Sequence, residues 1–194
     1  MPLILPHEGT YVFEEKRSKF LGYCAPVSTE EAAREVIQKI RAAHPKANHH
    51  VFAYATTADN ITRMSDDGEP SGTAGMPILT MFTREGIINY VCVVTRYFGG
   101  TLLGTGGLVK AYTHAAKGAM EAAQPHMLIL YTTYRLVCEY NRFDKLKYDL
   151  EKQKVEILGI DYTDKCMLVV KVTEAQAQNF HASLSHGILK EVVV

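Results

Sequence analysis

The stretch that decides the fold is residues 96–112, RYFGGTLLGTGGLVKAY, where five glycines separate a buried-looking strand from a helix. Such a junction brings unpaired backbone N–H groups and the positive end of the helix dipole to one point. Arg96 at the end of the strand and Lys110 in the first helical turn add positive charge on both sides of the loop. The pattern therefore favours a phosphate site, for a small molecule or for an RNA backbone. The alternative is that the glycines only let the loop turn tightly and the helix lie close to the sheet.

A second glycine-rich loop lies upstream, at residues 65–75, with the sequence SDDGEPSGTAG. It carries three carboxylates, on Asp66, Asp67 and Glu69. Close carboxylates can hold Mg²⁺, and the N–H groups of the residues that end the loop can hold an anion, since a helix follows. The alternative is that Asp67 and Gly68 form a turn whose polar side chains bond their own backbone. The turn is favoured over a metal because no complete ligand set is present, whereas the anion site and the turn remain equal alternatives.

The chain before these loops has the patterns of a hairpin, a helix and a strand. Strand-like residues 11–15 and 19–27 are joined by a short polar segment. Ser28 followed by Glu31 predicts a capping box at the start of a helix. Residues 48–56 then alternate as a strand does.

His50, Phe52 and Tyr54 lie on one face of this expected strand, because successive strand residues point to opposite faces. Such a stripe can serve as a base-stacking platform. Burial in the core is favoured, since aromatic side chains are mostly buried. His49 and His50 point to opposite faces, so they cannot readily share one metal ion, and no metal site is expected.

Helical and strand patterns continue to the end of the chain. A polar loop at 57–75 precedes an expected helix at 76–84, a strand at 87–96 and a helix at 108–123. Residues 129–194 follow the order β-α-β-β-α-β, which is the ferredoxin-like pattern. We therefore expect an α+β protein of two domains, residues 1–126 and 127–194.

The composition is that of a soluble globular protein, with 47% hydrophobic and 22% charged residues in a chain of 194. Lys plus Arg number 21 and Asp plus Glu number 21, so the net charge is zero. This balance argues against strong non-specific binding to nucleic acid, which depends on a basic excess, but it leaves room for a local basic patch. The four cysteines are far apart without a C-x-x-C pair, so neither a metal cluster nor a disulfide framework is expected. Pro2, Pro6 and Glu8 interrupt the first apolar residues, so we expect no secretory signal, no membrane span and a cytoplasmic location.

The two glycine-rich loops, together with HHVFAY at residues 49–54, resemble the signature of the YigZ/IMPACT family, and the resemblance covers the whole chain. It implies an N-terminal domain with the β-α-β fold seen in the second domain of a small-subunit ribosomal protein and in domain IV of elongation factor G. It also implies a ferredoxin-like C-terminal domain similar to domain V of that factor, in agreement with the element order above. Eukaryotic IMPACT carries a preceding RWD domain through which it influences translation initiation. The shared region begins almost at Met1 here, so that role is not carried over.

The domain pairing that the resemblance implies leads to the principal hypothesis, a non-catalytic protein that binds RNA or the ribosome and regulates translation, without a cofactor and without a membrane partner. The rival hypothesis is an enzyme that acts on a small phosphorylated substrate, with Mg²⁺ held by the acidic trio. No catalytic pair is evident, and neither a Walker motif nor a G-x-G-x-x-G fingerprint is present. A third possibility is that both loops only serve packing. The candidate residues for nucleic acid or phosphate are Asp66, Asp67, Gly68, Glu69, Arg96, Tyr97, Gly99, Gly100, Gly104, Lys110 and His50.

Overall fold

A computed structural model describes residues 2–184 and 188–193. The chain divides into two compact units, Met1–Leu128 and Ile129–Val194. The first unit contains a five-stranded sheet with a core on each face, and the second contains a four-stranded sheet with a core of its own. The predicted α+β class with two domains is therefore confirmed. Within the described residues, no helix combines the length and the hydrophobicity needed to cross a membrane.

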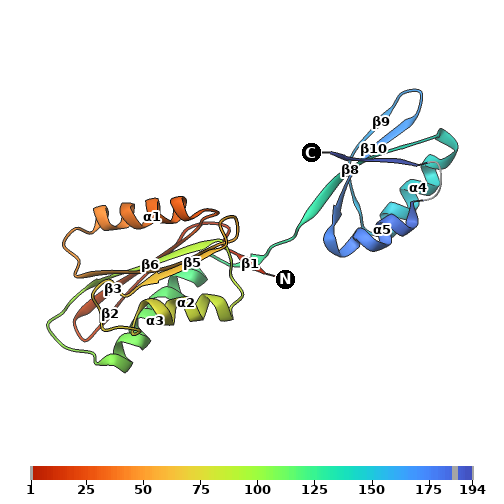
Figure 1. Ribbon diagram of the computed structural model, residues 1–194. Coiled ribbons are helices and arrows are strands. Elements are labelled where there is room, and N and C mark those ends of the chain that lie inside the picture. Colours follow the sequence, from red (N-terminus) through yellow and green to blue (C-terminus); the bar gives the residue numbers. More distant parts are fainter. Residues whose placement is uncertain (1, 185–187, 194) are drawn as a thin grey trace. The chain divides into compact units, whose positions relative to one another are not determined.

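The N-terminal unit is built on a five-stranded antiparallel sheet in the order β2-β3-β6-β4-β5. Its strands are β2 (Gly9–Glu15), β3 (Ser18–Pro26), β4 (His49–Thr56), β5 (Ile61–Ser65) and β6 (Tyr90–Tyr97). Helix α1 (Glu30–Ala43) covers one face, and helices α2 (Gly75–Arg84) and α3 (Thr105–Ala122) cover the other (Figure 1). A two-stranded sheet pairs β1 (Leu3–Ile4) with β7 (His126–Met127).

The central strand β6 explains why helices cover both faces of this sheet. Its residues are buried from Tyr90 to Arg96, and they alternate between two cores. Cys92 and Val94 belong to the core beneath α2 and α3, whereas Val91 and Val93 belong to the core beneath α1. A strand that is apolar on both sides must be covered on both sides, because burying apolar surface stabilises the fold.

Several element boundaries differ from the prediction. The N-cap of α1 is Thr29 and not Ser28, because the Thr29 hydroxyl accepts the hydrogen bond from the Ala32 N–H group at 3.2 Å. The polar loop at 57–75 contains the strand β5, which sequence patterns did not reveal. β5 is an edge strand with mostly polar, partly exposed residues, and its pairing with β4 stabilises it in place of a hydrophobic pattern.

The C-terminal unit has the predicted β-α-β-β-α-β order. Its elements are β8 (Tyr131–Cys138), α4 (Tyr140–Lys152), β9 (Glu156–Tyr162), β10 (Cys166–Thr173), a short 3₁₀ helix (Glu174–Gln176), α5 (Ala177–Ser183) and β11 (Leu189–Val193). The antiparallel sheet has the order β11-β8-β10-β9. This places the first strand beside the fourth and the third, as the ferredoxin-like prediction requires.

Candidate functional site

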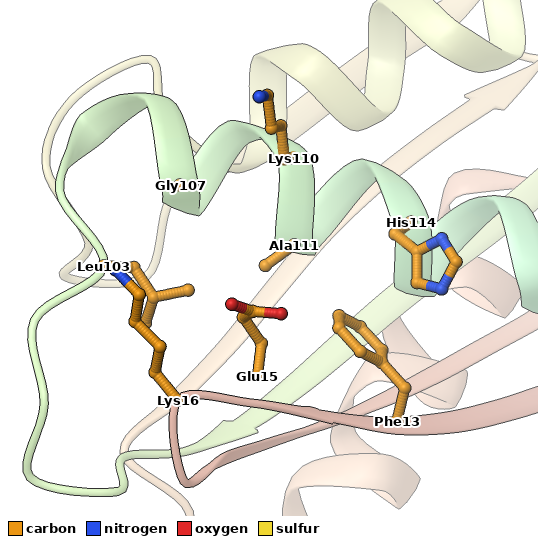
Figure 2. Close-up of a pocket in the computed structure, with 8 residues that line it drawn as sticks. All are labelled: Phe13, Glu15, Lys16, Leu103, Gly107, Lys110, Ala111 and His114. Carbon is orange, nitrogen blue, oxygen red and sulfur yellow. The ribbon is translucent and has the colours of Figure 1, made fainter.

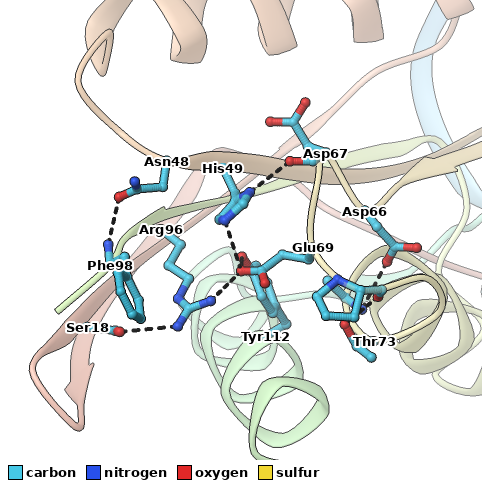
Figure 3. Close-up of polar contacts among 12 residues, drawn as sticks. Ser18, Asn48, His49, Asp66, Asp67, Glu69, Thr73, Arg96, Phe98 and Tyr112 are labelled. Carbon is cyan, nitrogen blue, oxygen red and sulfur yellow. Dashed lines mark hydrogen bonds and ion pairs between the residues drawn. The ribbon is translucent and has the colours of Figure 1, made fainter. Parts of the chain in front are cut away.

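Glu69 of the first glycine-rich loop lies in a buried polar cluster (Figure 3). One of its carboxylate oxygens accepts hydrogen bonds from the Arg96 guanidinium at 2.6 Å and from the Tyr112 hydroxyl at 2.7 Å. The Nε2 atom of His49 lies 3.7 Å from the same oxygen. Burial, reinforced by the bond to Glu69, raises the pKa of Tyr112 well above its usual value, so this hydroxyl stays a donor. Glu69 therefore joins the first loop to β6 and α3.

Arg96 is 4% exposed and faces inward from β6. Besides Glu69 it donates to the Ser18 hydroxyl at 3.3 Å, and its guanidinium lies 5.4 Å from the ring of Phe20 and 5.3 Å from that of Phe98. Its charge is thus balanced by a buried carboxylate and covered by two aromatic rings. The structure places this predicted phosphate ligand in the interior, where it connects the two glycine-rich loops (Figure 3).

Asp66 closes the start of α2 from within the chain. Its carboxylate accepts hydrogen bonds from the N–H groups of Gly72 at 2.8 Å, Ala74 at 3.0 Å and Gly75 at 2.8 Å. These are the N–H groups that the sequence offered to an external anion, and a carboxylate is the kind of group that a helix start favours. The anion site is present, and the chain's own side chain occupies it.

Asp67 and Gly68 form the turn at the tip of this loop, with positive φ angles of 44° and 88°. The Asp67 carboxylate accepts a hydrogen bond from the His50 N–H group at 2.6 Å and pairs with Arg41. His50 is buried, and burial together with the nearby Arg41 charge lowers the pKa of His50. Its imidazole is therefore neutral at pH 7. Among the described residues, no group of three or more His, Cys, Asp or Glu side chains is arranged to hold a metal ion.

The second glycine-rich loop differs from the first at the start of the helix that follows it. Gly99 packs on the backbone of the β2–β3 hairpin, where a Cβ atom would lie 2.0 Å from the Arg17 carbonyl carbon. Gly104 is the N-cap of α3 with a φ of 72°, and no side chain in the described part of the chain caps this helix start. The first-turn N–H groups of an α-helix have no partner inside the helix. They remain available here, beside Leu102, which is 82% exposed.

A hollow of about 410 Å³ lies between this helix start and the β2–β3 hairpin (Figure 2). Figure 2 shows the Glu15 carboxylate below α3, with Lys16 extending beside it toward Leu103 and Lys110 projecting from α3 on the side away from Glu15. Arg17 follows Lys16 in the hairpin turn, and both have left-handed backbone angles. None of these three cations forms an ion pair with a described residue. The lining residues are Phe13, Glu15, Lys16, Leu103, Gly107, Lys110, Ala111 and His114.

Phe98 is the exposed aromatic residue of this region, which sequence reasoning missed in favour of Tyr97. The Tyr97 hydroxyl is 3.0 Å from the Nδ1 atom of His44, so Tyr97 is held on the α1 side of the sheet. Phe98 is 43% exposed, its N–H group donates to the Asn48 amide oxygen at 2.8 Å, and Arg96 lies behind its ring. Strand alternation predicts that Arg96 and Tyr97 point to opposite faces of the sheet. Phe98 is the first residue after the strand, so this alternation does not hold its ring against either face.

The chain is similar to known proteins along most of its length. The model of the Impact N-terminal domain matches residues 16–120, and that of a domain of unknown function, DUF1949, matches residues 136–185. The IMPACT family member YigZ of Escherichia coli (strain K12) is 37% identical over 179 residues, which are 91% of this chain and 88% of that protein. This chain belongs to the IMPACT family.

Other relatives in the family also match most of this chain. The IMPACT family member YvyE of Bacillus subtilis (strain 168) is 34% identical over 177 residues, which are 89% of this chain and 80% of that protein. A solved structure described as the crystal structure of an hypothetical protein is 36% identical. It covers 99% of this chain and 97% of its own, with a TM-score of 0.61. The two-domain fold is thus shared with the family along the whole chain.

Proposed function

We propose that this IMPACT-family protein binds RNA through a glycine-loop surface, which we define as the hairpin turn 15–18, the loop 98–104 and the first turns of α3. The observation that carries the proposal is that Lys16, Arg17 and Lys110, all exposed, lack ion-pair partners among the described residues and surround an uncapped helix start. Neutralising phosphates is the main source of affinity for nucleic acid.

The other parts of the glycine-loop surface suit a single strand of RNA. Backbone N–H groups at a helix start bind phosphate oxygens without needing a charged side chain. Phe98, exposed and backed by Arg96, offers a ring on which a base can stack. The chain has no net charge, so the interaction depends on this local arrangement and not on a general attraction.

The proposed role of this binding is regulation of translation without catalysis. It is supported by the implied similarity of the two domains to domains IV and V of elongation factor G, which is an argument from fold. The rival hypothesis of a Mg²⁺-dependent enzyme has less support. Asp66, Asp67 and Glu69, which would hold the ion, are all engaged with other groups of the chain.

A fluorescence-anisotropy titration with a labelled single-stranded RNA of mixed sequence tests the proposal. We compare the wild type with the double variant Lys16→Ala/Lys110→Ala at several salt concentrations. The matched control is Lys39→Ala/Lys46→Ala, which removes two exposed lysines elsewhere on the same unit.

The wild type is expected to bind with an affinity that falls steeply as salt rises. Removing two phosphate contacts should make the slope of log K against log salt less negative by about 1.4, since each contact to a single strand contributes roughly −0.7. The control should keep both the affinity and the slope. Equal losses in the two double variants, or binding that salt does not change, would rule out the glycine-loop surface.

A further inference from the structure

On the face of the N-terminal sheet opposite to α2 and α3, a groove of about 500 Å³ lies between α1 and the edge strand β5. Helix α1 covers this face (Figure 1), and β5 is the edge strand of the sheet beside β4. Three arginines gather here with an aromatic floor, a combination absent from the sequence motifs. The groove is lined by Arg34, Ile37, Gln38, Arg41, Phe52, Tyr54, Arg63 and Met64.

The fold brings these side chains together by simple periodicities. Arg34, Gln38 and Arg41 follow one another at helical spacing, so they form one stripe along α1. Arg63 pairs directly with Tyr54 across the β4–β5 ladder, so both point to the α1 side. The helix therefore contributes one wall with two guanidinium groups, and the edge strand contributes the third from the other side.

The charges around the groove leave one cation in excess. Arg34 pairs with Glu30 at 2.8 Å and Arg41 pairs with Asp67, whereas Arg63 has no ion pair with any described residue. Three cations and two carboxylates give a net charge of plus one. Arginine presents five N–H donors in a planar fork that matches phosphate oxygens. Even the paired arginines therefore keep donors that face the groove or the solvent.

The floor of the groove consists of two nearly parallel rings. Phe52 and Tyr54 have ring centroids 6.0 Å apart and an interplanar angle of 16°. Tyr54 is 3% exposed, and its hydroxyl donates to Glu30 at 2.8 Å, which fixes the ring. Phe52 is half-buried and keeps an accessible surface, with Ile37 and Met64 among the other lining residues. Aromatic side chains of this kind stack on nucleobases, which all have a flat π-face.

We propose that this groove binds a mononucleotide, with the base stacked on Phe52 and the phosphate held by Arg63 and Arg34. Apolar lining with a few polar groups and a volume of several hundred cubic ångströms is typical of small-molecule sites. Gln38 also lines the groove, and its amide can both donate to and accept from a base edge. The site lies on the other face of the sheet from α3, so it stands independently of the RNA surface proposed above.

Isothermal titration calorimetry with AMP tests this site on the full chain. The variants are Arg63→Ala, which removes the unpaired guanidinium, and Phe52→Leu, which removes the stacking ring but keeps an apolar side chain. Arg84→Ala is the matched control, because Arg84 is also exposed but lies at the end of α2 on the other face. Adenosine and inorganic phosphate, each alone, separate the two halves of the ligand.

Saturable binding of AMP is expected, weakened roughly tenfold or more by Arg63→Ala, since a hydrogen bond to a charged group contributes about 1.5–3 kcal/mol. Phe52→Leu should weaken it roughly fivefold or more, from the loss of stacking. Arg84→Ala should bind as the wild type does, and each half of the ligand should bind more weakly than AMP.

No saturation at millimolar AMP, or phosphate binding as tightly as AMP, would overturn the proposal. An acidic peptide that binds while AMP does not would also overturn it. RNA affinity at the glycine-loop surface is measured separately, so failure of one proposal leaves the other intact.

Discussion

The two glycine-rich loops of the N-terminal unit each lead into a helix, yet the two helix starts differ in whether a side chain of the loop occupies them. In the first loop, the acidic side chains bond to groups of the chain itself. The Asp66 carboxylate accepts hydrogen bonds from N–H groups at the start of α2, and Glu69 forms a buried ion pair with Arg96. The second loop has no acidic residue within its sequence, so nothing in it reaches back to the start of α3. In these two loops, the helix start occupied by a carboxylate of the chain is that of α2, whereas the start of α3 has no such group in its own loop.

The largest effect is expected from breaking the ion pair that joins the loops. Arg96→Met leaves the Glu69 carboxylate buried without its charged partner, which should lower the free energy of unfolding by about 3–5 kcal/mol. Urea denaturation followed by circular dichroism measures this loss. If the first loop serves to stabilise the fold, the variant loses stability even when no ligand is present.

The double variant Arg96→Met/Glu69→Gln is the control for this experiment. It buries no charge, and the amide keeps an acceptor for the Tyr112 hydroxyl, so it should be more stable than the single variant by about 1–2 kcal/mol. A loss below about 1 kcal/mol in the single variant, the scale of an exposed pair, would show that the cluster does not secure the first loop.

A smaller loss is expected from opening the first helix start. Asp66→Ala removes the acceptor of three N–H groups and should cost about 2–3 kcal/mol, because hydrogen bonds to charged groups are the stronger ones. Glu85→Ala, which removes an exposed acidic group at the other end of α2, should change stability by about 0.5 kcal/mol or less. Inorganic phosphate should then stabilise the Asp66 variant more than the wild type. Equal stability of the two variants would remove the contrast between the loops.

Sequence patterns predicted the fold well because most elements carry their own periodic signal. The strand β6, the helix α3 and the whole β-α-β-β-α-β order were predicted within a few residues. The strand β5 was not, since its residues are held by pairing with β4 and not by an apolar face. The helix cap at Thr29 was misplaced by one residue because Ser28 and Thr29 are both good caps, and only tertiary geometry selects one.

Long-range partners were beyond the reach of sequence patterns. Cys24 lies opposite Cys92 across two strands, and Cys138 lies opposite Cys166, although all four are distant in sequence. All four are free and buried, and burial raises the pKa of Cys24 to about 12. Arg96 shows the same limit at the site. Its position beside the glycines suggested a ligand contact, but the partner that neutralises it belongs to the other loop.

A modest gain in RNA affinity is expected from removing the one carboxylate in the hollow of the second loop. Glu15→Gln should tighten RNA binding roughly twofold to fivefold. It removes the repulsion between this carboxylate and a phosphate, and an exposed pair of charges contributes about 0.5–1 kcal/mol to the binding free energy. Glu14→Gln is the matched control, since Glu14 is exposed and points to the other face of β2. Fluorescence anisotropy with the labelled RNA compares them. Equal affinities in the two variants would place the RNA away from the hollow.

The smallest effect concerns Gly106, in the first turn of α3. A Cβ atom built there meets nothing within 4 Å, and its φ is not positive, so the fold does not require glycine. Gly106→Ala should therefore stabilise the protein by about 0.5 kcal/mol, because alanine has the higher helix propensity and restricts the unfolded chain. If phosphates approach the uncapped helix start, the added methyl group should also weaken RNA binding, by roughly twofold to threefold. Gly159→Ala, at another uncrowded glycine, should leave RNA affinity unchanged. A variant that is more stable and binds RNA less well would show that the open helix start is kept for a ligand. A variant that binds RNA as the wild type does would show that the helix start takes no part, and that only the cations and Phe98 of the glycine-loop surface contact RNA.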